Sequence, residues 1–472
     1  MNKLHNIIMV LALIMTASLW QSCSDSYPDL TYSTDEKNTE DYLTYPLSPS
    51  LNVNSLLYAT SSGVAANSVP DVTLSGVTAK AITPVDKDSE GPLDPQNNYD
   101  NFIKRYAKAR FYLLAYRKSV MTDGDAALTQ LPDFSQLMGD DDNRLNCLLS
   151  TERTYISGTA QHIGKLAIPQ GATKDGSLDQ LSTNGSLFLL DNREWEDNQN
   201  YKTQTYYWNK KKYEKVGYNF FAYYINKANV YGFEKQQDCV KIDLELNGKN
   251  DIMVGVAPEV TEEMLKEEYS TSVTEEQIRK TILNYGDGAY STYGAVHSVE
   301  PKIDLKHALA YLKFRVKLMD DAVKISIQDI QVTACTRGKL VVASRDLEKT
   351  RLGLTELSEE KDISVNAYLS EEDISTEDFK EVGEGILVPP ADSYKVKILI
   401  QQTHVKTSET DTNPKGIMQT WLEVDCTPEK GFEAGKIYVL DLSVYGTTRI
   451  DITSDLESWK SGIGTVINLF DD

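Results

Sequence analysis

Residues 303–318, IDLKHALAYLKFRVKL, constrain the fold most, because two runs of alternating apolar residues meet there. The first run has apolar residues at 303, 305 and 309, with His307 between them, and the second has apolar residues at 312, 314, 316 and 318. A period of two indicates a strand with one buried face. The phase changes near Ala310 and Tyr311, where a β-bulge would keep both runs on one face. Helical spacing of positions 305, 308, 309 and 312 is the alternative; we favour the strand.

Short alternating or aromatic-rich runs recur along the chain and predict many strands. They cover residues 51–58, 72–79, 110–116, 218–225, 240–246, 251–256, 323–333, 339–342, 385–401, 421–425, 436–445 and 449–452. Residues 119–201 are polar and weakly patterned, so short strands within them are expected but not placed. Residues 346–385 are acidic and loop-like, with a possible helix at 370–379.

The number of strands predicts an all-β chain with two tandem β-sandwich domains, at 46–300 and 301–472. Residues 261–283 break the β pattern. Thr261 and Thr274 each precede a glutamate-rich turn, so each is a candidate helix N-cap. The first domain is therefore expected to carry a short helical insertion.

The N-terminus has the features of a secretory signal. A basic start is followed by an apolar run from Ile7 to Leu19, which is too short to span a membrane, and then by Ser22 and Cys23. The expected signal peptide is 1–22, with Cys23 taking lipid as the mature N-terminus, as in a bacterial lipobox. A plain signal peptide with a fortuitous cysteine is the alternative. Residues 23–45 read as an acidic tether.

Charge and cysteine content bound the partners. The formal net charge of the 472 residues is −22, and no basic stripe is visible, which argues against nucleic acid as a partner. Cys147, Cys239, Cys335 and Cys426 show no metal-ligand spacing. Export would permit disulfides, and four buried thiols are an equal alternative, so their pairing stays open.

Enzymatic motifs are missing from the sequence. It contains no HExxH, GxSxG or phosphate-binding glycine loop, so we expect no enzyme, cofactor or metal site. His307 is the best-placed of the histidines 162, 297, 307 and 404, and we expect it to be packed and hydrogen-bonded. Three tryptophans could stack on sugars, but core or hinge packing is the preferred interpretation; they are Trp208, Trp421 and Trp459.

The order of segments resembles the fimbrillin-like (Mfa-like) family of Bacteroidetes surface lipoproteins, subunits of type V pili. Cys23 matches the family's lipidated cysteine, and His307 and Trp459 fall on a histidine and a late tryptophan of its pattern. The remaining matches are RFYLLAY (110–116), YYWNKKKYEKVGYNFFAYYI (206–225), NDIMVGVA (250–257), residues 303–318, GILVPPADSYKVKILI (385–400) and FEAGKIYVLDLSVYG (432–446).

This resemblance implies two tandem transthyretin-like β-sandwiches and assembly by strand exchange. In the family, a subunit loses its first strand to proteolysis, often after an arginine, and another subunit's terminal segment fills the groove. The mature chain has no arginine before Arg105, which leaves Lys37 and Lys80 as plausible early sites. Lys80 follows the strand-like run 72–79 and is the candidate cleavage site. Residues 465–470, TVINLF, are the candidate donor strand, with an ordinary last strand or tail as the alternative.

Two functions follow as expectations. The first is a structural, lipid-anchored fimbrial subunit at the outer membrane and cell surface, with other fimbrial subunits as partners and a contribution to adhesion. The second is a surface lipoprotein that binds a glycan or another host or bacterial surface ligand without polymerising. The missing early arginine favours an anchor, tip or accessory subunit over a shaft subunit.

Overall fold

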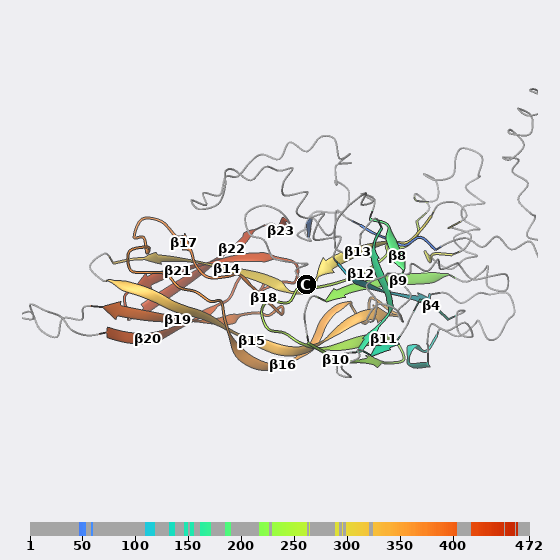
Figure 1. Cartoon of the computed structure of the whole chain (residues 1–472), viewed down its shortest axis with the longest axis horizontal. Helices are drawn as coiled ribbons and strands as arrows, with labels where there is room; N and C mark the ends of the chain where they lie inside the picture. The colour runs from blue at the N-terminus through green and yellow to red at the C-terminus, as the bar shows by residue number, and fades with distance from the viewer. Residues whose placement is uncertain are drawn as a thin grey trace, which may run out of the picture. The chain divides into compact units, whose positions relative to one another are not determined.

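The chain is described here from a computed structural model (Figure 1). The structure describes residues 47–52, 58–59, 109–118, 132–136, 146–149, 152–154, 161–170, 185–189, 217–225, 229–261, 264, 288–291, 295, 299–320, 324–403, 417–447, 449–457 and 459–460. Regular structure in these residues is β apart from the 3-10 turn η3 (Phe134–Gln136) and single helical positions at Met264 and Ala295. The all-β expectation is confirmed.

Three sheets carry most of the strands. The first contains β1 (Ser50–Leu51), β3 (Phe111–Arg117), β4 (Cys147–Leu149), β7 (Lys165–Pro169), β8 (Leu187–Leu189), β9 (Tyr218–Ile225), β12 (Ile252–Val256) and β13 (Lys302–His307). The second contains β10 (Asn229–Lys235), β11 (Cys239–Glu245), β15 (Ile325–Ser344), β16 (Gly353–Ser364), β19 (Tyr394–Thr403) and β20 (Ile417–Cys426). The third contains β14 (Ala310–Leu318), β17 (Lys380–Glu381), β18 (Ile386–Val388), β21 (Ile437–Tyr445) and β22 (Arg449–Glu457).

Two short pairs complete the described strands. β2 (Tyr58–Ala59) pairs with β23 (Trp459–Lys460), and β5 (Glu152–Thr154) pairs with β6 (Gln161–Ile163). The expected strand at 51–58 is thus represented by β1 and β2 near its two ends. The expected strand at 72–79 lies outside the described residues.

The central strands β3 and β9 of the first sheet are buried on both faces. In β3, the alternate residues Phe111, Leu113 and Ala115 enter one hydrophobic cluster, whereas Tyr112 and Leu114 enter another. Every residue of β3 is buried for this reason. A strand covered on both faces shows a continuous apolar run instead of alternation, which accounts for the sequence RFYLLAY.

Strand β15 links the two larger cores of the chain. Its first half, with Ile327 and Val332, packs in a cluster shared with the third sheet. Its second half, with Leu340 and Val342, packs in a cluster shared with the first sheet. The 20-residue strand accordingly pairs with β19 over one part of its length and with β11 over another (Figure 1). The sequence predicted two separate strands here, at 323–333 and 339–342.

The stretch at 303–318 is two strands in two sheets. β13 pairs with β12 in the first sheet, and β14 pairs in parallel with β21 in the third. The predicted single strand with a bulge is therefore wrong, and so is the helical alternative. Backbone groups at the junction bond to both sheets: the Ala308 N–H donates to Ile252 (2.8 Å), and the Leu309 carbonyl accepts from Gly435 (2.8 Å). The change in the phase of apolar alternation therefore occurs where the chain passes from the first sheet to the third.

Strand β16 contradicts the loop expected in the acidic segment 346–385. Half of its residues are exposed and only one is buried, and it is held by backbone pairing with β15. The possible helix at 370–379 is not formed: this part holds turns and bends, and the two-residue strand β17 begins directly after it. Edge strands need little apolar alternation, which explains why the pattern missed β16.

The helical insertion predicted at 261–283 lies almost wholly outside the described residues. Its predicted N-cap is described, and the Thr261 Oγ1 accepts a hydrogen bond from the Met264 backbone N–H (3.3 Å). The division into domains at 46–300 and 301–472 stays a prediction. Strands from both sides of residue 300 share the first and second sheets, as the pairing of β12 with β13 and of β11 with β15 shows.

Candidate functional site

The site proposed for function is the place that β1 occupies in the first sheet. On one side, β1 pairs in parallel with β13. The Ser50 N–H donates to the Pro301 carbonyl (3.0 Å), and the Asn52 N–H donates to the Ile303 carbonyl (2.8 Å). This side of β1 is therefore bonded to one end of the sheet.

The opposite side of β1 bonds to the other end of the same sheet. The Leu51 N–H donates to the Gly185 carbonyl (2.8 Å), and the Leu187 N–H donates to the Pro49 carbonyl (3.0 Å). An antiparallel bridge joins Ser50 to Ser186, next to β8. Because β1 and β8 are the two ends of the strand order, the bonds between β1 and the residues at β8 close the sheet into a barrel.

Side chains of this segment also fill the barrel. Leu47 and Leu51 are buried in the cluster that contains Phe111 and Ile303, and Leu51 has no exposed surface. Asn52 Nδ2 donates to Asp304 Oδ1 (2.6 Å), which fixes the register against β13. Removal of β1 would leave two unpaired strand edges beside an apolar pocket, which is the chemistry that binds an added strand.

The residues predicted to be modified lie outside the described part. Cys23, the candidate lipidation site, and Lys80, the candidate cleavage site, are both there, as is the candidate donor segment 465–470. Lipidation and cleavage stay predictions. Both β1 and β2 precede Lys80 in the chain, so a cut at Lys80 would separate them from the rest of the protein.

Both described histidines are packed inside the protein. His307 Nδ1 lies 2.8 Å from Asp251 Oδ1, and neither side chain is more than 1% exposed. The His162 ring stacks on Tyr112, with ring centroids 4.4 Å apart, and its Nδ1 lies 3.4 Å from the Tyr223 hydroxyl. The packed, hydrogen-bonded role expected of His307 is confirmed. His297 and His404 lie outside the described residues.

The cysteines Cys147, Cys239, Cys335 and Cys426 are present as thiols. Burial raises the pKa of Cys239 and of Cys426 to about 11, and burial also raises the pKa of Cys335. A raised pKa lowers the thiolate fraction at neutral pH, which makes these side chains poor nucleophiles.

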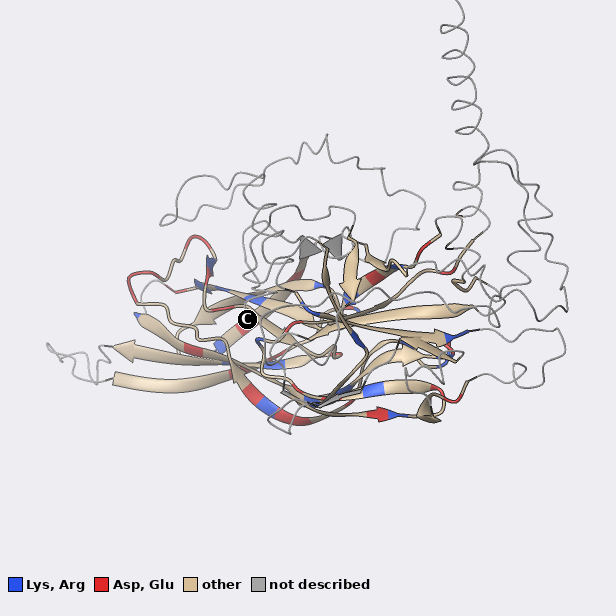
Figure 2. Cartoon of the chain, turned by 45° about the vertical axis from the view of Figure 1, so that its right-hand side comes forward, with Lys and Arg blue, Asp and Glu red and all other residues tan. Residues whose placement is uncertain are grey.

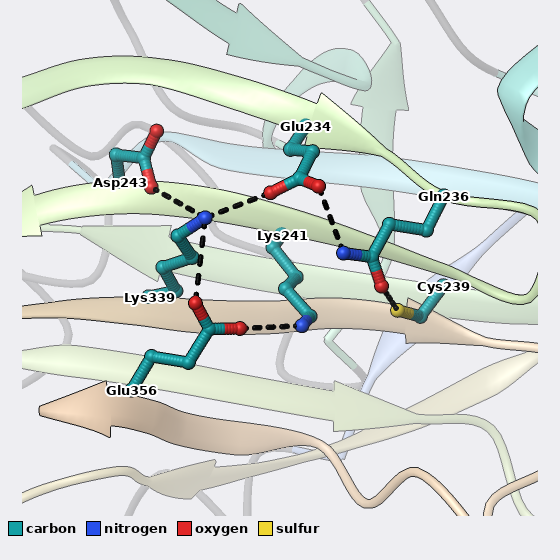
Figure 3. Close-up of polar contacts among 7 residues, drawn as sticks. All are labelled: Glu234, Gln236, Cys239, Lys241, Asp243, Lys339 and Glu356. Carbon is teal, nitrogen blue, oxygen red and sulfur yellow. Dashed lines mark hydrogen bonds and ion pairs between the residues drawn. The ribbon is translucent and has the colours of Figure 1, made fainter.

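A network of charged groups crosses the outer face of the second sheet (Figure 3). Lys339 Nζ lies 2.7 Å from Glu234, 3.4 Å from Glu356 and 3.8 Å from Asp243. Lys241 Nζ lies 2.6 Å from Glu356. These five side chains come from four adjacent strands, so the network ties β10, β11, β15 and β16 together.

Further hydrogen bonds extend the network, and contacts within it lower the pKa values of its glutamates. Gln236 Nε2 donates to Glu234 Oε1 (2.8 Å), and Cys239 Sγ donates to the Gln236 Oε1 (3.2 Å). Hydrogen bonds from Gln236 and Lys339 lower the pKa of Glu234, and the hydrogen bond from Lys241 lowers the pKa of Glu356. The sequence analysis missed this network, because the acidic strand β16 has no apolar signal.

Glu356 reaches this network from a strained backbone. Its φ of 51° is in the left-handed region, and it lies where the register between β15 and β16 shifts. Such conformations cost of the order of 1–3 kcal/mol for residues other than glycine. The bulge brings the carboxylate between two lysines, which indicates a structural role in holding the edge strand.

Acidic and basic residues are intermixed along the strands (Figure 2). No group of three or more potential metal ligands occurs within the described ranges. In the same part of the chain, no helix has the length and apolarity needed to cross a membrane. Neither the charge distribution nor the ligand geometry singles out a reactive centre there.

Trp421 differs from its expected packed position. It lies on β20 with 41% of its surface exposed, so core packing is wrong for this residue. Trp208 lies outside the described residues. For Trp459, the structure describes only its place in β23.

No protein-family model matches the chain, and no curated protein matches it. Among solved structures, it is similar to a "putative cell adhesion protein" from Bacteroides uniformis, at 12% identity and TM-score 0.33, covering 74% of this chain and 98% of that one. It is also similar to the fimbrial anchor protein Mfa2 from Porphyromonas gingivalis, at 9% identity and TM-score 0.27, covering 74% and 91%. At these TM-scores the likeness assigns no family.

Proposed function

We propose that this chain is a lipid-anchored subunit of a cell-surface fimbria, of the fimbrillin-like family, and that it assembles by strand exchange at the place of β1. One observation carries the proposal. Among the described strands, the two-residue strand β1 near the N-terminus is the one that bonds both to β13 and to the residues at β8. The order of sequence motifs that resembles the family supports it independently.

Exchange at this place has a simple physical basis. A segment that leaves uncovers backbone donors and acceptors on both flanking strands, and uncovers the apolar surface that Leu47 and Leu51 bury. An incoming strand with alternating apolar residues restores both. The interface joins two different surfaces and is therefore heterologous, and it generates an open filament where the rotation between subunits does not close a ring. Residues 465–470 of another copy are the proposed donor.

Lipid on Cys23 would hold the first subunit at the outer membrane. Acyl chains anchor a protein by burying methylene groups, without a spanning helix. The acidic residues 23–45 would separate the lipid from the folded part. The proposed role is structural and adhesive, and we propose no enzymatic activity for the chain.

Intact surface material from a Bacteroidetes host that expresses the full-length chain tests this function. Gels of unboiled samples should show a ladder of stable multimers, and mass spectrometry should find a new N-terminus after Lys80. A Lys80→Gln variant should stay uncut and give no ladder. A single, uncut, lipid-bearing species from the wild-type chain would contradict assembly by exchange.

A non-polymerising surface binder is the second candidate. The observation that favours it is the lack of arginine between Cys23 and Arg105, where the family is often cut. An uncut chain keeps β1 in place and offers no vacant groove. The same gel and mass spectrum separate the two candidates, because only the polymerising subunit gives multimers with a new N-terminus.

A further inference from the structure

The outer face of the second sheet has an exposed aromatic surface at the β20 edge. Along β20, Leu422 and Val424 pack against the hydrophobic core. Alternate residues of a strand point to opposite faces, so Trp421 and Ile417 lie on the outer face. They are 41% and 70% exposed. Trp421 is not a member of the hydrophobic cluster that Leu422 and Val424 pack against.

Cross-strand neighbours place polar groups around Trp421. It pairs directly with Leu399 on β19, and Leu399 pairs with Asp329 on β15. The next outward pair along the same two strands is Gln419 with Gln401. The pair lies two residues from Trp421, a rise of roughly 7 Å. On the outer face of the sheet, the cross-strand pair that contains Trp421 is therefore followed by a pair of glutamine amides.

The two glutamines retain hydrogen-bonding capacity. Gln419 Nε2 donates to Gln401 Oε1 (2.7 Å). That bond holds both amide planes in position. It leaves the Gln401 amide nitrogen and the Gln419 amide oxygen with no partner among the described residues, as a donor and an acceptor for a ligand.

Charged groups further along this face are already paired. Lys397 Nζ lies 2.7 Å from Asp362 and 3.7 Å from Glu423. Lys395 lies 3.6 Å from Glu423. Opposite charges at these distances offset one another, so this surface has no concentrated charge of one sign to select an ionic ligand.

We infer that the surface formed by Trp421, Leu399, Gln401 and Gln419 binds a neutral glycan. The electron-rich face of an indole attracts the polarised C–H bonds of a sugar ring, and the two amides supply a donor and an acceptor for hydroxyl groups. A second protein strand would instead pair along the backbone edge of β20 and would not need the tryptophan on the outer face. The site is separate from β1, so it stands whether or not the chain polymerises.

The test is native electrophoresis of the mature full-length protein through gels that contain mannan, dextran, xylan or laminarin. At least one of these neutral polysaccharides should retard the wild-type protein. Trp421→Ala should abolish the retardation, and Trp421→Phe should keep part of it because the ring is retained. Tyr368→Ala is the matched control, since Tyr368 is an aromatic side chain that is 66% exposed elsewhere, and it should migrate as the wild type does.

Replacement of the amides tests the polar half of the site. Gln401→Ala with Gln419→Ala should weaken retardation and alter the order of preference among the four polysaccharides. The inference is overturned if none of the four retards the wild-type protein, or if Trp421→Ala is retarded as strongly. It is also overturned if Trp421→Ala changes only the oligomeric state measured by size exclusion, because the surface would then be an interface between protein chains.

Discussion

Leu51 is the residue on which closure of the first sheet depends most. It is completely buried, and its N–H bonds across to Gly185. Its neighbour Ser48 is exposed, although it belongs to the same segment. A substitution at Leu51 removes a buried contact, whereas a substitution at Ser48 alters the same segment without removing one. Comparison of the two isolates the effect of the buried contact.

Leu51→Ala should lower the free energy of unfolding by about 2–5 kcal/mol, the usual range for truncating a buried leucine. Urea titration of the full chain, followed by near-ultraviolet circular dichroism, measures the change. Ser48→Ala should leave the transition within about 0.5 kcal/mol of the wild type. Equal stability of the Leu51→Ala protein would show that β1 does not hold the barrel closed.

The stability that the charged network on the outer face of the second sheet contributes depends on pH through Glu356. Its pKa is lowered by Lys241, so its stabilising contribution is present above the ordinary value of 4.5 and is lost as pH falls through the lowered pKa. The pKa of Glu234 is also lowered, so its contribution to stability is likewise lost as the pH falls. The lysines have raised pKa values, so their contribution is lost only above 10.5.

Glu356→Gln should lower the melting temperature at pH 6–7 and should have a progressively smaller effect as the pH is lowered towards 2, because the wild-type carboxylate takes up a proton as the pH falls through its lowered pKa. Thermal unfolding of both proteins in steps across that range measures the difference. Lys349, whose ion pair with Asp346 is exposed and lies away from the network, gives the control Lys349→Gln, which should change little. A Glu356→Gln difference that grows on acidification would contradict the assigned role.

Among the strands, β12 and β13 make the tightest backbone approach through Gly255. A Cβ built there would lie 1.9 Å from the Asp304 carbonyl oxygen. Side-chain atoms do not approach backbone so closely, so the two strands can pair only with glycine at this position. The sequence NDIMVGV showed the strand and gave no sign of this contact.

Gly255→Ala should separate β12 from β13 and destabilise the protein by about 1–3 kcal/mol, the usual cost of overpacking. Gly232→Ala on β10 is the matched control, because a Cβ there meets nothing within 4 Å. Amide hydrogen exchange should accelerate at β12 and β13 in the first variant and not in the second. Unchanged protection at both strands would refute the predicted clash.

Strand predictions were correct where the burial of a strand's own side chains is visible in its sequence. The alternation of Leu312, Phe314 and Val316 appears unchanged in β14, and β3 and β9 coincide with their aromatic runs. Predictions failed where another part of the chain decides the outcome. The junction between β13 and β14 depends on bonds to two sheets, and β16 depends on β15. Exposure of Trp421 depends on β20 lying at an edge. The alternation of apolar residues within a strand does not indicate which other strands it pairs with.

The candidate site was predictable only in part. The resemblance led us to expect that an N-terminal strand would matter, but not that residues 50–51 bridge β8 and β13. The short run at 51–58 gives no hint of its partners, because Gly185 and Pro301 are distant in sequence. Packed histidines could be predicted from their apolar neighbours, whereas the charged network required knowledge of four adjacent strands.

Across the whole chain, the account rests on β1 being the strand that exchanges. Asn52 and Asp304 allow it to be locked, because their side chains meet at 2.6 Å across β1 and β13. The parallel register that pairs Leu51 with Ile303 places these two positions opposite each other, so we expect cysteines there to form a disulfide. Cys239, Cys335 and Cys426 have raised pKa values and are poor competitors for oxidation.

The most direct measurement is the multimer ladder of the Asn52→Cys, Asp304→Cys chain on gels of unboiled surface material. The account predicts a single species while the disulfide is intact and a ladder like that of the wild type after reduction. The Asn52→Cys chain alone should form the ladder under both conditions. A full ladder from the oxidised double variant, or no ladder from the wild-type chain, would contradict exchange at β1.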